Sequence, residues 1–228
     1  IVSSDDGLNA AGGADQSGFG GRGPDRFGGS SDSSIMISGG TIRIDASGDG
    51  IDSNGDLNVS GGKIYVSGPM SDGDSALDYD GAGTITGGTV VAAGYSGMAQ
   101  NFSADSTQGS ILLTCQSAST ETIRVTDASG NVLVEFTPAK AYTCVVVSTP
   151  ALTQGSTYTV AMGGQSTDVT LESLIYGTGG MGGGMGGQPG GGMGTPPDGN
   201  NGSNMSTPPD GTGGSMGTPP DGTGVPTI

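Results

Sequence analysis

The sequence contains no histidine and no tryptophan. Without histidine, the chain excludes Ser-His-Asp and Cys-His catalysis, and it excludes zinc sites with imidazole ligands. Basic residues are also scarce, because 6 Lys and Arg face 22 Asp and Glu among 228 residues and leave a formal net charge of -16. That charge disfavours nucleic acid and anionic membranes as partners.

Long apolar runs and aromatic side chains are lacking as well. Aromatic residues make up 4% of the chain and glycine occupies 49 positions, so a conventional core of leucine and phenylalanine is not expected. Apolar runs such as residues 111–113 and 145–147 are far too short to cross a bilayer. Nearly all the acids are aspartates, and short acids in a glycine-rich chain favour turns and calcium ligation.

A repeated motif is present in the first half of the chain. It reads Ser38-Gly-Gly-Thr-Ile-Arg-Ile, then Ser60-Gly-Gly-Lys-Ile-Tyr-Val, then Thr86-Gly-Gly-Thr-Val-Val-Ala, at steps of 22 and 26 residues. Each copy alternates as a strand does. One side of the predicted strands carries Ile42, Ile44, Ile64, Val66, Val90 and Ala92, and the other side carries Arg43, Tyr65 and Val91. The segments that begin at Asp6, Asp49 and Asp74 precede these strands, and each places one aliphatic residue in a polar turn.

This period predicts an all-β fold, a right-handed parallel β-helix in which each rung buries its aliphatic residues by stacking on the next. Propeller blades and leucine-rich repeats fit the spacing less well. We assign residues 1–104 to the rungs, with a glycine-rich insertion at 17–34. Residues 105–176 contain closely spaced strand patterns separated by tight turns, which predict antiparallel hairpins that cap the last rung. A separate small sandwich is the alternative.

Two further features concern covalent links and assembly. Cys115 and Cys144 lie in the predicted hairpins and form either a disulfide or two buried thiols. Residues 177–228 form a Gly/Met/Pro-rich tail with three Thr-Pro-Pro-Asp-Gly copies, which lacks the apolar residues for a core of its own. Such a tail is ordered by docking on its own body or on a neighbouring subunit, so one alternative function is a subunit of a self-assembling extracellular filament.

The motifs carry a family resemblance. The stretch 35–94 contains Ser47-Gly-Asp-Gly-Ile-Asp-Ser-Asn-Gly and Ala76-Leu-Asp-Tyr-Asp-Gly, and it resembles a clostridial family of secreted carbohydrate-binding proteins related in fold to pectate lyases. Thr137-Pro-Ala-Lys-Ala-Tyr is similar to the C-terminal part of that family, and the resemblance covers residues 5–176. It implies a non-catalytic extracellular or cell-surface protein that binds calcium and acidic or cellulosic plant polysaccharides. Relative to longer members, the first rungs are expected to be missing.

The aspartates point to calcium independently of the resemblance. Candidate ligands are Asp49, Asp52 and Asp56 in one rung and Asp74, Asp78 and Asp80 in the next, with Asp5, Asp6 and Asn9 extending the column. If the rungs stack in register, Asp49 lies near Asp74 and Asp52 near Asp78, and such carboxylates repel one another unless a cation lies between them. The alternative is that these residues only form Asx turns that face solvent.

Candidates for polysaccharide binding are Tyr65, Tyr79 and Tyr95 as stacking platforms and Arg43 as a carboxylate ligand. Calcium would bridge protein carboxylates to uronate carboxylates, which lets an acidic protein hold an acidic polymer. Equally, the tyrosines pack between rungs. Lyase activity is the enzymatic alternative, but the few basic residues on the body are too scattered for a catalytic base with substrate clamps. We therefore predict no enzymatic activity.

Overall fold

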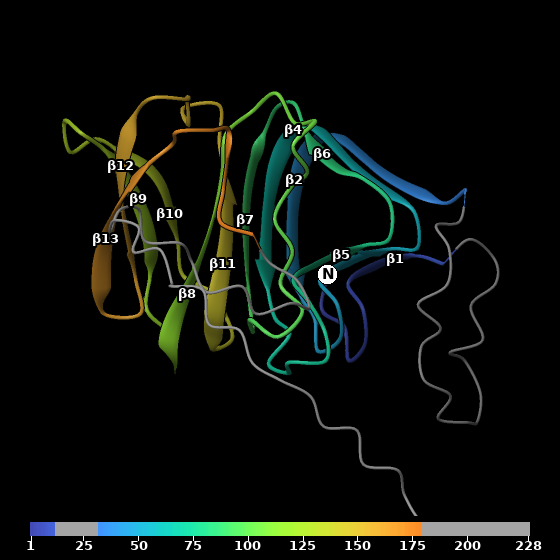
Figure 1. Ribbon diagram of the computed structural model, residues 1–228. Coiled ribbons are helices and arrows are strands. Elements are labelled where there is room, and N and C mark those ends of the chain that lie inside the picture. Colours follow the sequence, from blue (N-terminus) through green and yellow to red (C-terminus); the bar gives the residue numbers. More distant parts are fainter. Residues whose placement is uncertain (12–31, 179–228) are drawn as a thin grey trace, which may run out of the picture. The chain divides into compact units, whose positions relative to one another are not determined.

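The computed structural model describes residues 1–11 and 32–178, which form strands, turns and loops without a helix (Figure 1). The strands are β1 (Leu8–Ala10), β2 (Ser34–Asp45), β3 (Ile51–Ser53), β4 (Asp56–Ser67), β5 (Leu77–Tyr79), β6 (Gly83–Ile85), β7 (Thr89–Gly94), β8 (Ser110–Ser119), β9 (Ile123–Asp127), β10 (Val132–Phe136), β11 (Tyr142–Ser148), β12 (Thr157–Met162), β13 (Gln165–Thr170) and β14 (Ile175–Tyr176). The described residues all belong to one compact unit. Most of the insertion expected at 17–34 and nearly all of the tail lie outside the described residues.

The repeated segments stack as parallel strands with the steps read from the sequence. In β2, β4 and β7, Ile42 pairs with Ile64, and Ile64 pairs with Val90. In the second column, β1, β3 and β5 are parallel, and Ile51 pairs with both Leu8 and Leu77. The expected alternation of faces is confirmed, because Ile64 and Val90 lie in one core, whereas Val91 lies in another.

A Gly-Gly corner bends each long strand and breaks its pairing register. Gly40, Gly62 and Gly88 occupy this corner in three successive repeats with φ of 82°, 95° and 91°, a region that residues with a Cβ rarely adopt. The stacking is also close there, since a Cβ on Gly62 would lie 2.9 Å from the carbonyl oxygen of Gly39. At Gly62 and Gly88, which stack on a preceding repeat, the second glycine of the motif is therefore required by both backbone angle and space.

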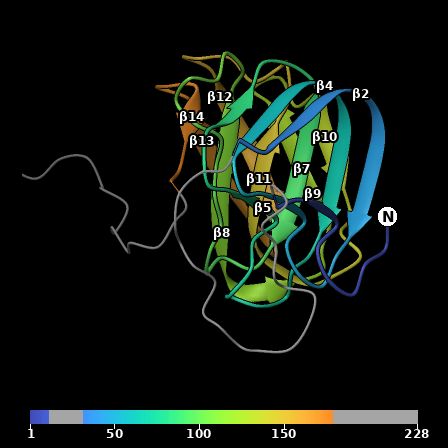
Figure 2. The ribbon, with the colours of Figure 1, turned by 90° about the vertical axis from the view of Figure 1, so that its right-hand side faces the viewer.

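Three sheets are layered on one another, and the seven-stranded sheet lies in the middle (Figures 1 and 2). Its strand order is β14-β8-β11-β7-β4-β2, with β6 pairing β4 beside this path. Alternate residues of β7 enter different cores: Val90 and Ala92 pack in the core shared with β1, β3 and β5, while Val91 and Ala93 pack in the core shared with the four-stranded sheet. Strands buried on both faces explain the unbroken apolar runs of this region.

The C-terminal strands continue the middle sheet. β11 pairs antiparallel with β7 and with β8, so the edge of the last parallel strand is covered. The remaining strands form an antiparallel sheet of order β10-β9-β12-β13 that packs on the opposite face of the middle sheet. Residues 105–176 are thus not a separate sandwich, because their strands β8 and β11 share a sheet with β4 and β7.

Both cysteines are free thiols. Cys144 belongs to the core on the β3 side of the middle sheet, and Cys115 packs against the core on the other side. Burial raises the pKa of Cys144 to about 12. Of the two alternatives, the structure has two thiols, because side chains on opposite faces of one sheet do not meet the geometry of a disulfide. No helix that could cross a membrane occurs among residues 1–11 and 32–178.

Candidate metal centre

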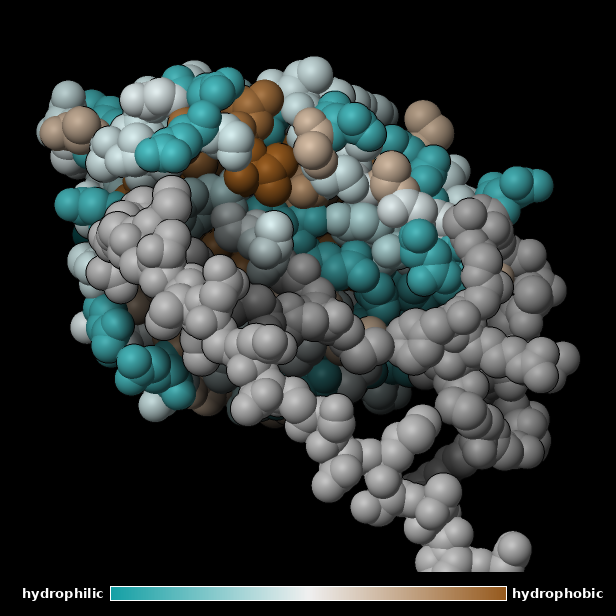
Figure 3. All heavy atoms as spheres, viewed as in Figure 1, coloured by the Kyte–Doolittle hydropathy of each residue, from teal (hydrophilic) through white to brown (hydrophobic). Residues whose placement is uncertain are grey.

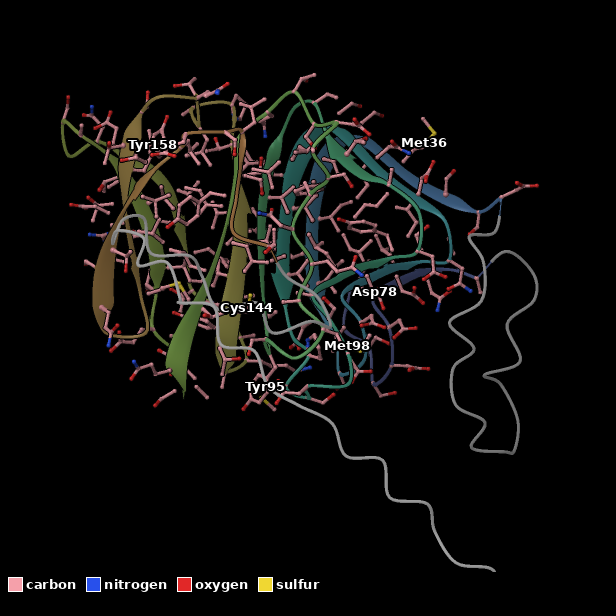
Figure 4. All side chains as sticks on the ribbon, in the orientation of Figure 1. Met36, Asp78, Tyr95, Met98, Cys144 and Tyr158 are labelled. Atoms are coloured by element: carbon pink, nitrogen blue, oxygen red, sulfur yellow. The ribbon has the colours of Figure 1, made fainter. Side chains whose placement is uncertain are left out.

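Three carboxylates converge where the second and third repeats stack. Asp52 and Asp78 are register partners in β3 and β5, and Asp49 lies two residues before β3. One ligand oxygen from each of the three lies within 4.8 Å of the other two, and all three residues are half-buried. Figure 4 labels Asp78 on the side of the molecule where β1 and β5 run. The predicted approach of Asp52 to Asp78 is confirmed.

The first repeat extends this cluster. Asn9 donates from Nδ2 to Asp6 Oδ2 at 2.7 Å and to Asp52 Oδ2 at 2.9 Å. Asp6 also accepts the backbone N–H of Asp49 at 2.8 Å through Oδ1. The amide of Asn9 therefore links the carboxylates of two repeats, as expected from its register with Asp52 in β1 and β3.

The next turn of chain closes the other end of the cluster. Gln100 donates from Nε2 to Asp78 Oδ1 at 3.2 Å and accepts the backbone N–H of Tyr79 at 3.3 Å. Asp49 accepts the backbone N–H of Ser75 at 2.5 Å. The sequence reasoning missed Gln100, although a further step of 22 residues from Asp78 reaches it.

Electrostatics within the cluster favour a bound positive charge. Burial above all, and then repulsion from the neighbouring carboxylates, raise the pKa of Asp49 to about 8, against a backbone hydrogen bond that lowers it. The pKa of Asp78 is also raised, first by burial and then by the charge of Asp80. Bound protons or a cation would relieve this repulsion, because several carboxylates at this separation do not all ionise without cost.

The remaining predicted ligands lie around the three rather than among them. Asp74 accepts a hydrogen bond from the Ser71 hydroxyl and is not one of the three converging carboxylates. Asp56 is exposed at the start of β4, and its Oδ1 accepts the backbone N–H of Ala82 at 2.9 Å. Asp80 is exposed and acts on Asp78 only through its charge. Asp5 enters the turn through its backbone carbonyl, which accepts the N–H of Gly48.

Two of the three tyrosines predicted as sugar platforms, Tyr65 and Tyr79, have side chains engaged with the protein. The Tyr65 ring lies 5.2 Å from the Phe136 ring, and the guanidinium carbon of Arg43 lies 4.6 Å from the Tyr65 centroid. The hydroxyl of Tyr79 donates to the backbone carbonyl of Asn101. Tyr95 is half-buried, with its backbone N–H bonded to Pro69. Figure 3 shows a largely hydrophilic face with brown side chains confined to small areas.

The basic side chains also have structural partners. Lys140 lies 2.8 Å from a carboxylate oxygen of Asp45, and Arg124 pairs with Glu135 on the four-stranded sheet. Arg43 stacks on Tyr65, so these three cations lie on different elements, and each has a partner outside the three-aspartate cluster. This arrangement gives no support to a lyase site.

Comparison with protein-family models, with curated proteins and with solved structures finds no match for this chain. The resemblance to secreted clostridial carbohydrate-binding proteins therefore stays a prediction.

Proposed function

We propose that the described residues form a three-coil right-handed parallel β-helix, completed by antiparallel strands, that binds calcium at Asp49, Asp52 and Asp78. The convergence of these three carboxylates within 4.8 Å carries the proposal. Three carboxylates offer up to six oxygens, and calcium takes six to eight oxygen ligands in flexible geometry. Water and the nearby Asp6 carboxylate would supply the rest.

The surrounding residues suit a hard cation. Asn9 has both a donor and an acceptor on its amide, so rotation of that amide would turn its oxygen toward a bound ion. Bound calcium would replace the protons that the raised pKa of Asp49 otherwise retains. Because the ligands come from separate repeats, the ion would hold the stacked coils together.

We further propose that calcium bridges this extracellular or cell-surface protein to an acidic polysaccharide, in a non-catalytic role. The engaged tyrosines support bridging rather than ring stacking as the mode of binding, since Tyr65 and Tyr79 already contact protein groups. A chain of net charge -16 would repel polyuronate without an intervening cation.

Calorimetric titration of the chain with CaCl₂ in metal-free buffer tests the metal site. We expect saturable binding that is lost in Asp52→Asn with Asp78→Asn. Asp168→Asn with Glu172→Gln is the matched control, because it removes the same two charges from exposed positions in and after β13, away from the cluster. Loss of binding in the control as well, or no binding by the original chain, contradicts the site.

Binding to immobilised polygalacturonate then tests the polysaccharide. Retention should require calcium and should disappear on fully methyl-esterified pectin, in which the carboxylates are masked. If calcium binds in the calorimeter but polygalacturonate is not retained, the metal site stands and the polysaccharide proposal fails.

A further inference from the structure

The longest unpaired strand edge among the described residues belongs to β2. This strand is last in the order of the seven-stranded sheet, and the sheet ends on the other side at β14, which has only two residues. β2 has 12 residues. Exposed edges of this length invite pairing, and soluble proteins usually protect them with charges, prolines or a covering segment. Residues 34–42 of β2 contain neither a charged residue nor a proline.

The backbone groups that face outward on this edge follow from the hydrogen bonds to β4. The N–H of Asp56 donates to the carbonyl of Ser33 across the β4 side. Since these groups alternate between the two sides of a strand, Ile35 and Ile37 turn their N–H and C=O toward β4. Ser34 and Met36 turn theirs outward.

A parallel segment already occupies one end of the same edge. Ser3 donates its N–H to the carbonyl of Asp45 at 2.9 Å, and the N–H of Asp45 donates to the carbonyl of Ile1 at 3.0 Å. Val2 and Asp45 form a parallel bridge. The outer edge is thus shaped to accept a parallel strand, and this contact leaves residues 34–42 without a described strand on that side.

Aliphatic side chains also become less buried from β4 to the edge strand β2. Ile35 and Ile42 are only half-buried in β2, whereas their register partners Leu57 and Ile64 in β4 are fully buried. Met36 is 78% exposed, and Figure 4 shows it pointing away from the molecule. One more strand with inward aliphatic residues would complete the burial of the first repeat. Each Å² of apolar surface removed from water would stabilise the contact by about 25 cal/mol.

We infer that the outer edge of residues 34–42 is a docking site for a parallel β-strand of a separate polypeptide. The partner strand has the pattern of the repeats, aliphatic residues at alternate positions followed by Ser/Thr-Gly-Gly. The partner strand would pair with β2 as β2 pairs with β4, so the sequence of β2 itself indicates which residues fit. Backbone hydrogen bonds would supply the affinity, and the alternate aliphatic side chains would supply the register.

A fluorescein-labelled peptide that copies residues 33–42 tests the inference by fluorescence anisotropy. We expect saturable binding to the full chain, equal in calcium and in chelator. By the same alternation, methylation of the Ile35 and Ile37 amide nitrogens removes the donors that face the protein. It should weaken binding by about tenfold or more. Methylation at Ser34 and Met36 removes donors that face away, and it should leave binding within about twofold.

Absence of binding overturns the inference, and so does an equal loss with both methylated peptides. A protein variant gives an independent check. Met36→Pro deletes one outward-facing N–H of β2 and spares the hydrogen bonds to β4. Met36→Val is the control, because it keeps that N–H. Peptide binding should fall only in Met36→Pro, with unchanged melting temperature. If sedimentation shows that the chain dimerises and Met36→Pro abolishes the dimer, the edge serves a second copy and the separate partner is wrong.

Discussion

Asp52 and Asp78 are direct register partners on the parallel strands β3 and β5. Parallel stacking places side chains of equivalent residues beside one another along the whole column, so two aspartates at one position of the repeat become neighbours. With Asp49 they form the three-carboxylate cluster. The same register that buries Ile51 against Leu77 therefore also concentrates negative charge.

Replacing one partner should relieve this repulsion. In chelator, Asp78→Asn is expected to raise the melting temperature, since it removes a half-buried charge whose pKa is raised by burial and by neighbouring carboxylates. The expected gain is on the order of 1 kcal/mol. Replacing chelator with calcium should stabilise the variant less than it stabilises the original chain. Calorimetric melting in both conditions measures the difference, and an equal calcium gain in both proteins contradicts a role for Asp78.

Stability without metal should fall as pH rises. The pKa of Asp49 is about 8 in the folded chain against an ordinary 3.8, so between these values the folded state binds a proton that the unfolded state has lost. The free energy of unfolding then decreases with pH, by at most about 1.4 kcal/mol per unit for one proton. Urea unfolding in chelator from pH 5 to 8.5 measures the slope. Asp49→Asn should flatten it, and a slope unchanged by this variant assigns the effect elsewhere.

Calcium binding near pH 7.5 should release protons. The ion displaces the proton retained by Asp49, so the apparent binding enthalpy depends on the ionisation enthalpy of the buffer. Titrations in HEPES and in Tris, which differ in ionisation enthalpy, compare this dependence directly. Identical enthalpies in both buffers mean that Asp49 is already ionised before the metal binds.

The Gly-Gly corner offers a graded series of substitutions. Gly39→Ala should be nearly neutral, because no atom lies within 4 Å of its added Cβ and its φ is not positive. In Gly40→Ala only the positive φ opposes the added Cβ, and the free energy of unfolding should fall by about 1 kcal/mol. Gly62→Ala meets both the positive φ and the carbonyl of Gly39, and should cost more, up to about 3 kcal/mol. Chemical denaturation gives the order, and equal costs at all three positions contradict the stacked corner.

The two thiols should be unreactive in the folded chain. Burial raises the pKa of Cys144 to about 12 and also raises that of Cys115, so the nucleophilic thiolate is scarce at pH 8. Iodoacetamide should label both residues rapidly only after denaturation, with half-buried Cys115 the faster in the native state. Mass spectrometry measures this directly, and a native mass lower by two hydrogen atoms reveals a disulfide and contradicts the prediction.

Part of the candidate site was readable from sequence and part was not. The column of Asn9, Asp52 and Asp78 follows from the repeat, because residues at equivalent positions pair in register. Asp74 departs from it, since its local turn directs the carboxylate to Ser71. The sequence also did not determine the contacts of the tyrosines, because Tyr65 contacts Phe136 only when the four-stranded sheet packs on the middle sheet.

The sequence by itself determined which residues of the first half share a ladder and a face. A two-residue alternation and a Gly-Gly marker at steps of 22 and 26 residues leave a single register that buries all the aliphatic residues together. Only the tertiary structure decided that β8 and β11 join the same sheet and that Cys115 and Cys144 lie on opposite faces of it. Strand order and layer packing depend on contacts between segments far apart in the chain, which local patterns do not encode.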